Sequence, residues 1–199
     1  MSNFAPNSTA MISIFDDMSQ MTETEVQRML PLVNGQRREE ALGYKHLFGQ
    51  YTCLKSWLML QELTKQLGIN DLEFEFNEHG KPYLIRYPDV HFNISHCKNG
   101  IAVAVDNAPV GIDIESFRKV DDTLIHKTMN EAEQRQIFSA ENPIERFIAL
   151  WTQKEAVLKL RGTGISTDLH QVLDNRGYRL ETHIIKEKRY AWSIAFTEE

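Results

Sequence analysis

The chain has 199 residues, 42% of them hydrophobic and 25% charged, which is an ordinary composition for a soluble globular protein. Its 28 acidic and 22 basic residues give a net charge of −6, so general nucleic-acid binding, which needs a basic face, is a poor candidate. No run approaches the roughly 18 apolar residues of a membrane helix, and residues 1–21 lack the regions of a secretion signal. The two cysteines, Cys53 and Cys97, have no close spacing, so we expect free thiols and a cytoplasmic protein.

The sequence of the first half predicts helices followed by strands. Thr22 and Glu25 resemble a capping box that opens a helix through Val33. A polar stretch at 36–48 and a more apolar one at 51–67 are expected to be helical. Strands are expected at 72–76, 81–85, 91–94 and 101–105, and the last strand of this set, at 110–114, follows the boundary near Asp106.

The second half repeats this order. Asn130 caps a predicted helix that runs to about Phe138, and Asn142 with Pro143 opens another that runs to about Leu160. A closing hairpin is expected at 178–185 and 190–196. We therefore predict an α+β fold of two similar α/β halves in a pseudo-twofold arrangement, covering residues 1–105 and 106–199.

Two acidic residues lie in the last of the predicted strands of the first set. Because side chains alternate along a strand, Asp113 and Glu115 share one face while Ile112 and Ile114 share the other. The isoleucines indicate that the strand is packed. A strand rim with solvated acids is the alternative interpretation.

The long helix of the second half supplies a third acid. Trp151, Glu155 and Lys159 are spaced by four and fall on one side of it. If this side meets Asp113 and Glu115, three carboxylates lie together, which requires a cation. Such hard oxygen ligands suit Mg²⁺. The alternatives are an ordinary Glu155–Lys159 helix pair, a solvated Lys154 and a core tryptophan.

A predicted strand in the first half ends in Ser95 and His96. A hydroxyl and an imidazole at a strand end can bind phosphate, and histidine can also exchange protons. The alternative is a capped loop with a surface histidine. No Gly-x-Ser-x-Gly motif surrounds Ser95, which disfavours a hydrolase nucleophile.

Four motifs, taken in order, resemble those of the 4′-phosphopantetheinyl transferase superfamily, in its longer two-half (surfactin-synthetase-activator) type. They are Gly80-Lys81-Pro82-Tyr83, Phe92-Asn93-Ile94-Ser95-His96, Gly111-Ile112-Asp113-Ile114-Glu115 and Trp151-Thr152-x-Lys154-Glu155-Ala156-x-x-Lys159.

The resemblance implies transfer of the phosphopantetheine arm of coenzyme A to a serine of an acyl or peptidyl carrier protein, releasing adenosine 3′,5′-bisphosphate. It implies that Asp113, Glu115 and Glu155 hold Mg²⁺, or Mn²⁺ in its place. Glu155, or Glu115 through water, is the expected base, and Lys159 stabilises the leaving phosphate. A non-catalytic relative that binds coenzyme A or a carrier, and a nucleotide pyrophosphatase, are the alternatives.

The resemblance also implies contacts with coenzyme A phosphates. Lys81, Ser95 and His96 are the expected ligands, and the basic residues Arg37, Arg38 and Lys45 are candidates for the 3′-phosphate, with a solvated helix face as the alternative. Cys97 stands where the family often has a second serine, and a thiol is a weak hydrogen-bond partner.

The carrier is expected to meet the segment 117–129, where Phe117, Arg118, Leu124, Ile125 and Met129 form an apolar and basic patch or pack on the core. The two halves of the site come from one chain, so a monomer is expected. The pathway, whether fatty acid, polyketide or peptide synthesis, is not indicated by the sequence.

Overall fold

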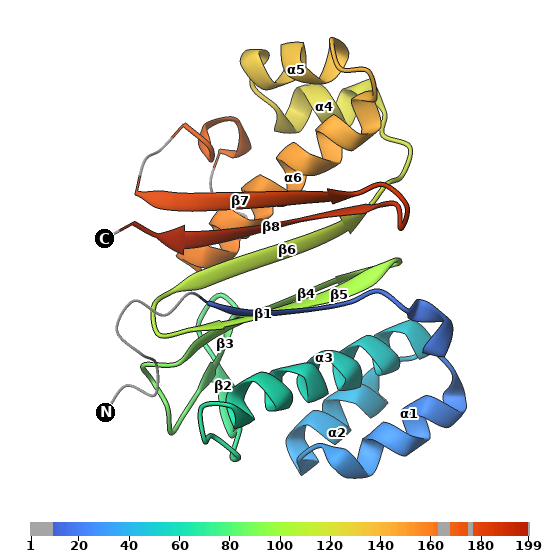
Figure 1. Cartoon of the computed structure of the whole chain (residues 1–199), viewed down its shortest axis with the longest axis vertical. Helices are drawn as coiled ribbons and strands as arrows, with labels where there is room; N and C mark the ends of the chain where they lie inside the picture. The colour runs from blue at the N-terminus through green and yellow to red at the C-terminus, as the bar shows by residue number, and fades with distance from the viewer. Residues whose placement is uncertain (1–9, 163–167, 175–176, 199) are drawn as a thin grey trace.

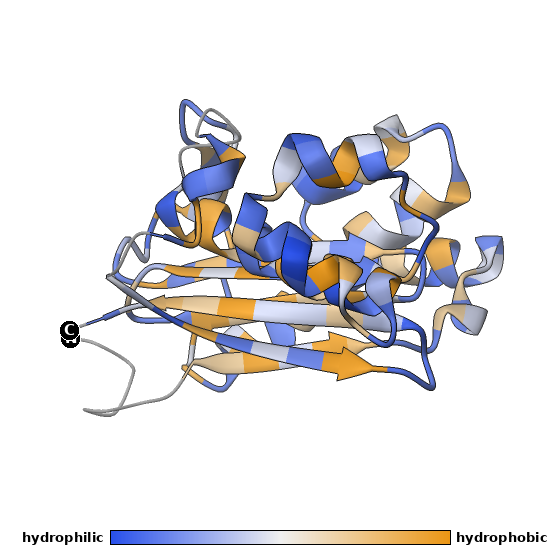
Figure 2. Cartoon of the chain, turned by 90° about the horizontal axis from the view of Figure 1, so that it is seen from above, coloured by the Kyte–Doolittle hydropathy of each residue, from blue (hydrophilic) through white to orange (hydrophobic). Residues whose placement is uncertain are grey.

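The computed structural model describes residues 10–162, 168–174 and 177–198 (Figure 1). Two three-stranded antiparallel sheets lie in the middle of the molecule, with one group of helices outside each sheet. Apolar residues run along the strands of both sheets, whereas the helices mix apolar and polar residues (Figure 2). This pattern is that of a layered molecule whose helices bury one face only.

From residue 10 onward, the described N-terminal part contains five strands and three α-helices. They are β1 (Met11–Phe15), α1 (Glu23–Met29), α2 (Gly35–Gly43), α3 (Leu47–Lys65), β2 (Phe74–Phe76), β3 (Pro82–Leu84), β4 (His91–Cys97) and β5 (Gly100–Asp106), with short 3₁₀ turns at Met18–Gln20 and Leu30–Leu32. The sheet order is β1-β5-β4, and β2 pairs with β3 in a separate hairpin.

Two features here differ from the sequence prediction. Strand β1 was not expected, and it pairs with β5 from Met11↔Val105 to Phe15↔Ile101. The helix predicted at 36–48 is wrong as a single element, because the backbone of Tyr44 is extended and separates α2 from α3. A Cβ at Gly49 would lie 2.6 Å from the Tyr44 ring, so the glycine lets this ring fold back onto α3.

The described residues of the C-terminal part form three strands and three α-helices. They are β6 (Val110–Ser116), α4 (Asp122–Thr128), α5 (Glu131–Phe138), α6 (Pro143–Arg161), β7 (Tyr178–Ile185) and β8 (Tyr190–Thr197), with a 3₁₀ turn at Leu169–Gln171. The predicted Asn130 capping box and the Asn142 cap with Pro143 are confirmed, and Gly162 ends α6 in the left-handed conformation. Helix α4 was not predicted.

The two sheets pack face to face over an apolar layer. Ala102 and Ala104 of β5 meet Ile112 and Ile114 of β6 and Ile194 of β8 in one cluster of buried side chains. Helix α3 covers the other face of the first sheet, and α6 covers the other face of the second, whose order is β6-β8-β7. Strand β6 is therefore an edge strand buried between α6 and the first sheet.

The mixed α and β architecture is confirmed. The pseudo-twofold relation and the division at residues 105/106 stay predictions. In the described part of the chain, no helix is both long and apolar enough to cross a membrane.

Candidate active site

The site forms where β6 and α6 touch backbone to backbone. A Cβ on Gly111 would lie 2.1 Å from the carbonyl oxygen of Ala156 and 2.3 Å from the amide nitrogen of Leu160, so only glycine allows this approach. Gly111 and Asp113 share the strand face that meets α6. The close contact therefore brings Asp113 beside the last turns of α6.

Asp113, Lys159 and Ser95 form a tight polar triangle. The Lys159 ammonium donates to Asp113 Oδ1 at 2.6 Å and to Ser95 Oγ at 2.9 Å, and the Ser95 hydroxyl donates to Asp113 Oδ1 at 2.8 Å. Asp113 is buried, and its Oδ2 atom has no hydrogen-bond partner among the described residues. Burying a carboxylate oxygen without a hydrogen-bond partner costs desolvation free energy. A ligand bound to this atom would offset that cost.

The charge of Asp113 acts on both Glu115 and Glu155. Burial, followed by repulsion from Asp113, raises the pKa of Glu115 to about 7. The same two causes raise the pKa of Glu155, while Lys159 acts in the opposite direction. The three acids predicted from the sequence thus form one electrostatically coupled group.

The donor types of this group fit a hard divalent cation. Carboxylate oxygens are the ligands of Mg²⁺, and the Asp113 Oδ2 atom is unsatisfied among the described residues. Burial and repulsion from Asp113 raise the pKa values of Glu115 and Glu155, and a bound cation would favour their ionised forms. Across residues 10–162, 168–174 and 177–198, however, no group of three or more His, Cys, Asp or Glu side chains has the arrangement of a metal site. The fit is one of chemistry and charge.

Strand β4 joins the first sheet to the site through side chains. Asn93 Oδ1 accepts from the Ile112 amide at 2.8 Å, and Ser95 Oγ accepts from the Ile114 amide at 3.4 Å. These bonds satisfy two backbone amides on the edge of β6, although β6 does not pair with β4 as a strand. The Phe-Asn-Ile-Ser-His motif therefore holds the two sheets together as well as completing the polar triangle.

His96 lies next to this triangle at the end of β4. The residue is accessible to solvent, and one edge of its ring packs against Phe48, with the ring centroids 5.6 Å apart. Desolvation by the surrounding protein, followed by the charge of Lys159, lowers the pKa of His96. A neutral imidazole is thus favoured at neutral pH.

A cavity of about 290 Å³ opens beside Glu155 and Lys159, and Lys81 and Asn93 also line it. Lys81 donates to the carbonyl oxygens of Lys159 at 2.7 Å and Val110 at 3.3 Å. Burial lowers the pKa of Lys81 to about 8. The β2–β3 turn is thereby linked to the end of α6.

The three upstream basic residues are not brought to this cavity. Arg37 is 6% exposed, its guanidinium lies 3.9 Å from the centre of the Trp57 ring, and it pairs with Glu40 at 2.9 Å. Arg38 is exposed and donates to backbone carbonyls of the preceding turn, and Lys45 is exposed between α2 and α3. Their contact with coenzyme A stays a prediction, and Arg37 has the least accessible surface for it.

Sequence reasoning missed Lys154. It was interpreted as a solvated lysine, but it is completely buried and paired with Glu133 at 2.8 Å. The helical position of Lys154, between the buried Leu150 and Leu158, was the available signal, because residues four apart share a helix face.

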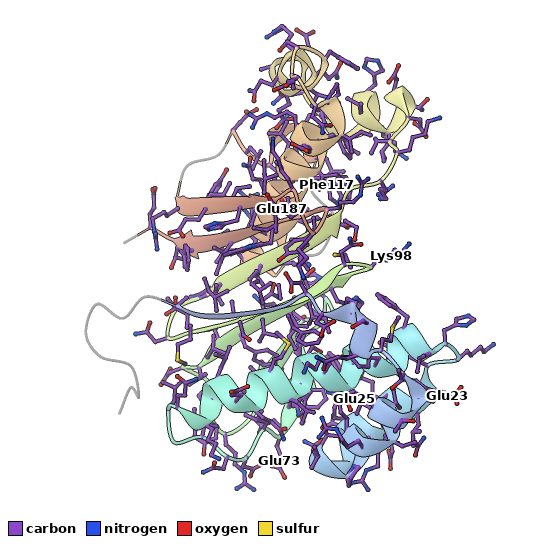
Figure 3. The ribbon with its side chains drawn as sticks, turned by 45° about the vertical axis from the view of Figure 1, so that its right-hand side comes forward. Glu23, Glu25, Glu73, Lys98, Phe117 and Glu187 are labelled. Atoms are coloured by element: carbon purple, nitrogen blue, oxygen red, sulfur yellow. The ribbon has the colours of Figure 1, made fainter. Side chains whose placement is uncertain are left out.

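The segment 117–129 divides between core and surface. Ile125 and Met129 are buried in the cluster under α6, and Phe117 and Leu124 are partly buried against it. Arg118 is exposed. Phe117, after β6, and Lys98, after β4, lie at the same end of these two strands (Figure 3).

Comparison with known proteins gives consistent matches. Residues 109–197 match the family model described as the 4′-phosphopantetheinyl transferase superfamily. The chain is 32% identical over 152 residues to 4′-phosphopantetheinyl transferase psf-1 of Bacillus pumilus, an alignment that covers 73% of this chain and 64% of the relative. It is 32% identical to a 4′-phosphopantetheinyl transferase of Bacillus subtilis (73% and 67% covered) and 27% identical to Sfp of Bacillus subtilis strain 168 (75% and 69%). The chain thus spans about two thirds of the length of these relatives.

Proposed function

The chain belongs to the 4′-phosphopantetheinyl transferase superfamily, and we propose that it transfers the phosphopantetheine arm of coenzyme A to a serine of an apo carrier protein. The observation that carries the proposal is the meeting of Asp113, Ser95 and Lys159 beside Glu115 and Glu155. This is a complete set of acids with a lysine, as the reaction requires. A binding-only relative would be expected to have lost at least one of them.

Asp113, Glu115 and Glu155 would hold Mg²⁺ or Mn²⁺. When bound, the ion would offset negative charge on the pyrophosphate of coenzyme A. Burial and, after it, repulsion from Asp113 raise the pKa values of Glu115 and Glu155, and the ion would relieve the repulsive part.

Transfer breaks the bond between the two phosphates of coenzyme A. The carrier serine oxygen forms a new bond to the phosphorus of the pantetheine-side phosphate, and adenosine 3′,5′-bisphosphate leaves. Lys159, held by Asp113 and Ser95, would face the charge that develops on the leaving phosphate. Ser95 and His96 would contact the phosphates, and Lys81 lines the same cavity.

Glu155 is our proposed base for the serine hydroxyl. It lines the cavity, and its raised pKa makes its carboxylate a better proton acceptor than an ordinary exposed glutamate. Glu115 acting through a water molecule is the second arrangement.

The carrier would approach the ends of β4 and β6. Lys98 and Arg118 are exposed there, and Phe117 is partly buried beside them (Figure 3). Local basic charge on this net acidic chain would complement the acidic helices typical of carriers. We propose that the protein acts as a cytoplasmic monomer.

Intact-mass measurement of an apo carrier, incubated with this protein, coenzyme A and Mg²⁺, tests the proposal. A mass increase of one phosphopantetheine, absent when the carrier serine is replaced by alanine, is the expected result. Hydrolysis of coenzyme A without a carrier would instead indicate a pyrophosphatase. Binding of coenzyme A with no transfer to several unrelated carriers would indicate a non-catalytic relative.

A further inference from the structure

A second lysine–carboxylate pair lies on α6, away from the cavity. The Lys154 ammonium contacts Glu133 Oε2 at 2.8 Å, and the two side chains are 0% and 6% exposed. Lysine is almost never fully buried unless it is paired. Lys154 does not line the cavity that Glu155 lines, although the two residues are adjacent in sequence. A role in holding substrate is therefore not open to it in this position.

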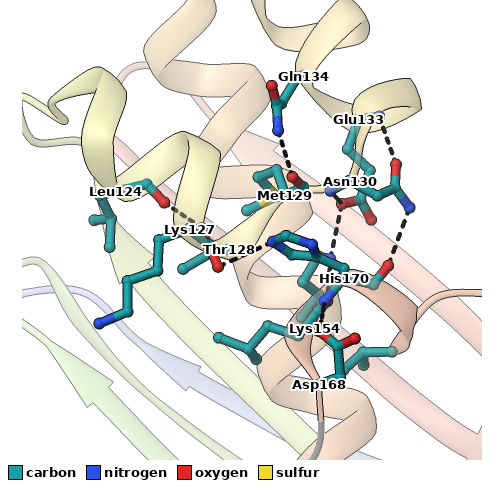
Figure 4. A network of polar contacts seen from close by, with 12 residues as sticks. Leu124, Lys127, Thr128, Met129, Asn130, Glu133, Gln134, Lys154, Asp168 and His170 are labelled. Carbon is teal, nitrogen blue, oxygen red and sulfur yellow. Dashed lines mark hydrogen bonds and ion pairs between the residues drawn. The ribbon is translucent and has the colours of Figure 1, made fainter.

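The pair joins three segments of the chain (Figure 4). Lys154, in the middle of α6, also donates to the carbonyl oxygen of Leu169 at 2.5 Å. Glu133, in the first turn of α5, also accepts from the Asn130 amide at 2.7 Å and completes the capping box of that helix. One ion pair thus fixes α6 to the start of α5 and to the turn at 168–171.

Further hydrogen bonds extend this network to α4. Asn130 Nδ2 donates to the His170 carbonyl at 3.1 Å, and His170 Nε2 lies 3.0 Å from the Lys127 carbonyl oxygen (Figure 4). Gln134 Nε2 donates to the Met129 carbonyl at 2.7 Å. The end of α4, which belongs to the segment 117–129, is therefore tied through α5 to the position of Lys154.

The network is not arranged for maximal stability. Glu133 Oε1 is buried and has no hydrogen-bond partner among the described residues. A buried ion pair with an unsatisfied oxygen contributes little net stability compared with apolar side chains of similar volume. The pair defines the position of α6 relative to α5, because the Lys154 ammonium bonds to one carboxylate, of Glu133, and to one carbonyl, of Leu169.

We propose that Lys154 and Glu133 are positioning residues, which fix α6 against α4 and α5 so that the segment 117–129 and Glu155 keep one relative placement. This inference rests on the proposed function, in which the carrier meets that segment and Glu155 takes the serine proton. A displacement of about 1 Å between them would be enough to lower turnover substantially.

Three variants of the full-length protein test the proposal: Glu133→Gln, Lys154→Met and the charge-balanced double variant. Glu131→Gln is the matched control, because Glu131 is also in the first turn of α5 but its side chain is 92% exposed. Transfer is measured well below the melting temperature of each variant. Coenzyme A affinity and the hydrogen exchange of amides 124–130 and 151–159 are measured alongside.

Each single variant should lose roughly 10 °C in melting temperature, since it leaves an unpaired buried group. The double variant should regain most of this loss, yet its kcat should stay about tenfold or more below the native value, with the coenzyme A Kd within twofold. Its amides at 124–130 and 151–159 should exchange faster than those of the control.

Two results would overturn the proposal. Full recovery of turnover and native exchange in the double variant would make the pair a stability element only. A coenzyme A Kd weakened tenfold or more would make Lys154 a substrate contact. If the native protein transfers nothing, the proposed function fails, while the hydrogen exchange still decides whether the pair fixes these segments.

Discussion

Helix α6 carries two lysine–carboxylate pairs that differ in their access to solvent. Lys159 is 28% exposed, pairs with Asp113 and lines a cavity. Lys154 is 0% exposed and divides its bonds between Glu133 and a backbone carbonyl. The comparison shows that a lysine and a carboxylate can either act on the substrate or hold helices in position. The deciding features are the partial exposure of the lysine and an adjoining cavity.

The largest effect is expected at the pair that adjoins the cavity. Asp113→Asn removes the charge that holds Lys159 and the oxygen left free for a ligand, so turnover should fall about a thousandfold. The measurement is the rate of carrier modification by intact mass. The control is Asp89→Asn at an exposed position. A loss below tenfold would show that the Lys159–Asp113 pair is not catalytic.

The contact that brings Asp113 beside α6 can be broken at Gly111. A Cβ there meets the backbone of α6 at 2.1 Å, so Gly111→Ala should cost about 3 kcal/mol or more and lower the melting temperature by roughly 6–12 °C. Gly35→Ala is the control, because nothing lies within 4 Å of its added Cβ in the first turn of α2. Equal melting temperatures for the two variants would refute the close approach of β6 and α6.

Glu115 and Glu155, near Asp113, should respond to pH and to metal. The pKa of Glu115 is raised to about 7, so its ionisation works against folding increasingly as pH rises from about 4.5 to 7. Bound Mg²⁺ favours the ionised form, so its affinity should increase about tenfold from pH 6 to pH 8. Magnesium titration followed by melting temperature measures this. A Glu115→Gln variant that keeps the same pH dependence would contradict the assignment.

The smallest effect is expected at Arg37. Arg37→Met removes a guanidinium that lies over the Trp57 ring and pairs with Glu40, so it should lower stability while changing the coenzyme A Kd less than twofold. Arg38→Met, at an exposed neighbouring position, is the companion variant. Calorimetric titration with coenzyme A measures this, and a tenfold weaker Kd for Arg37→Met would identify Arg37 as a phosphate ligand.

The sequence was most informative where one short pattern determines the geometry. The alternation in β6 placed Asp113 toward α6, and the spacing of four placed Glu155 and Lys159 on one side of the helix. These patterns and the helix caps depend on neighbouring residues only. Gly111 lies on the same face of β6, toward α6. Because it has no side chain, β6 approaches α6 closely enough for Asp113, Lys159 and Ser95 to bond to one another.

Features that depend on distant segments were not predictable in the same way. Strand β1 exists because β5 offers it an edge, and the burial of Lys154 depends on Glu133 and Leu169, which come from other elements. No local pattern distinguishes Lys154 from a solvated lysine except its place between apolar residues. Arg37 is a further example, since Trp57 and Phe74 bury it from outside its own helix.

The central claim is that Asp113, Glu115 and Glu155 bind a divalent cation together with coenzyme A. A titration with Mn²⁺ tests it most directly, with the free ion measured by its electron paramagnetic resonance signal. In the presence of coenzyme A, the native protein should remove about one equivalent of free Mn²⁺, and Asp113→Asn should remove far less. Equal binding by the two proteins would contradict the site as described.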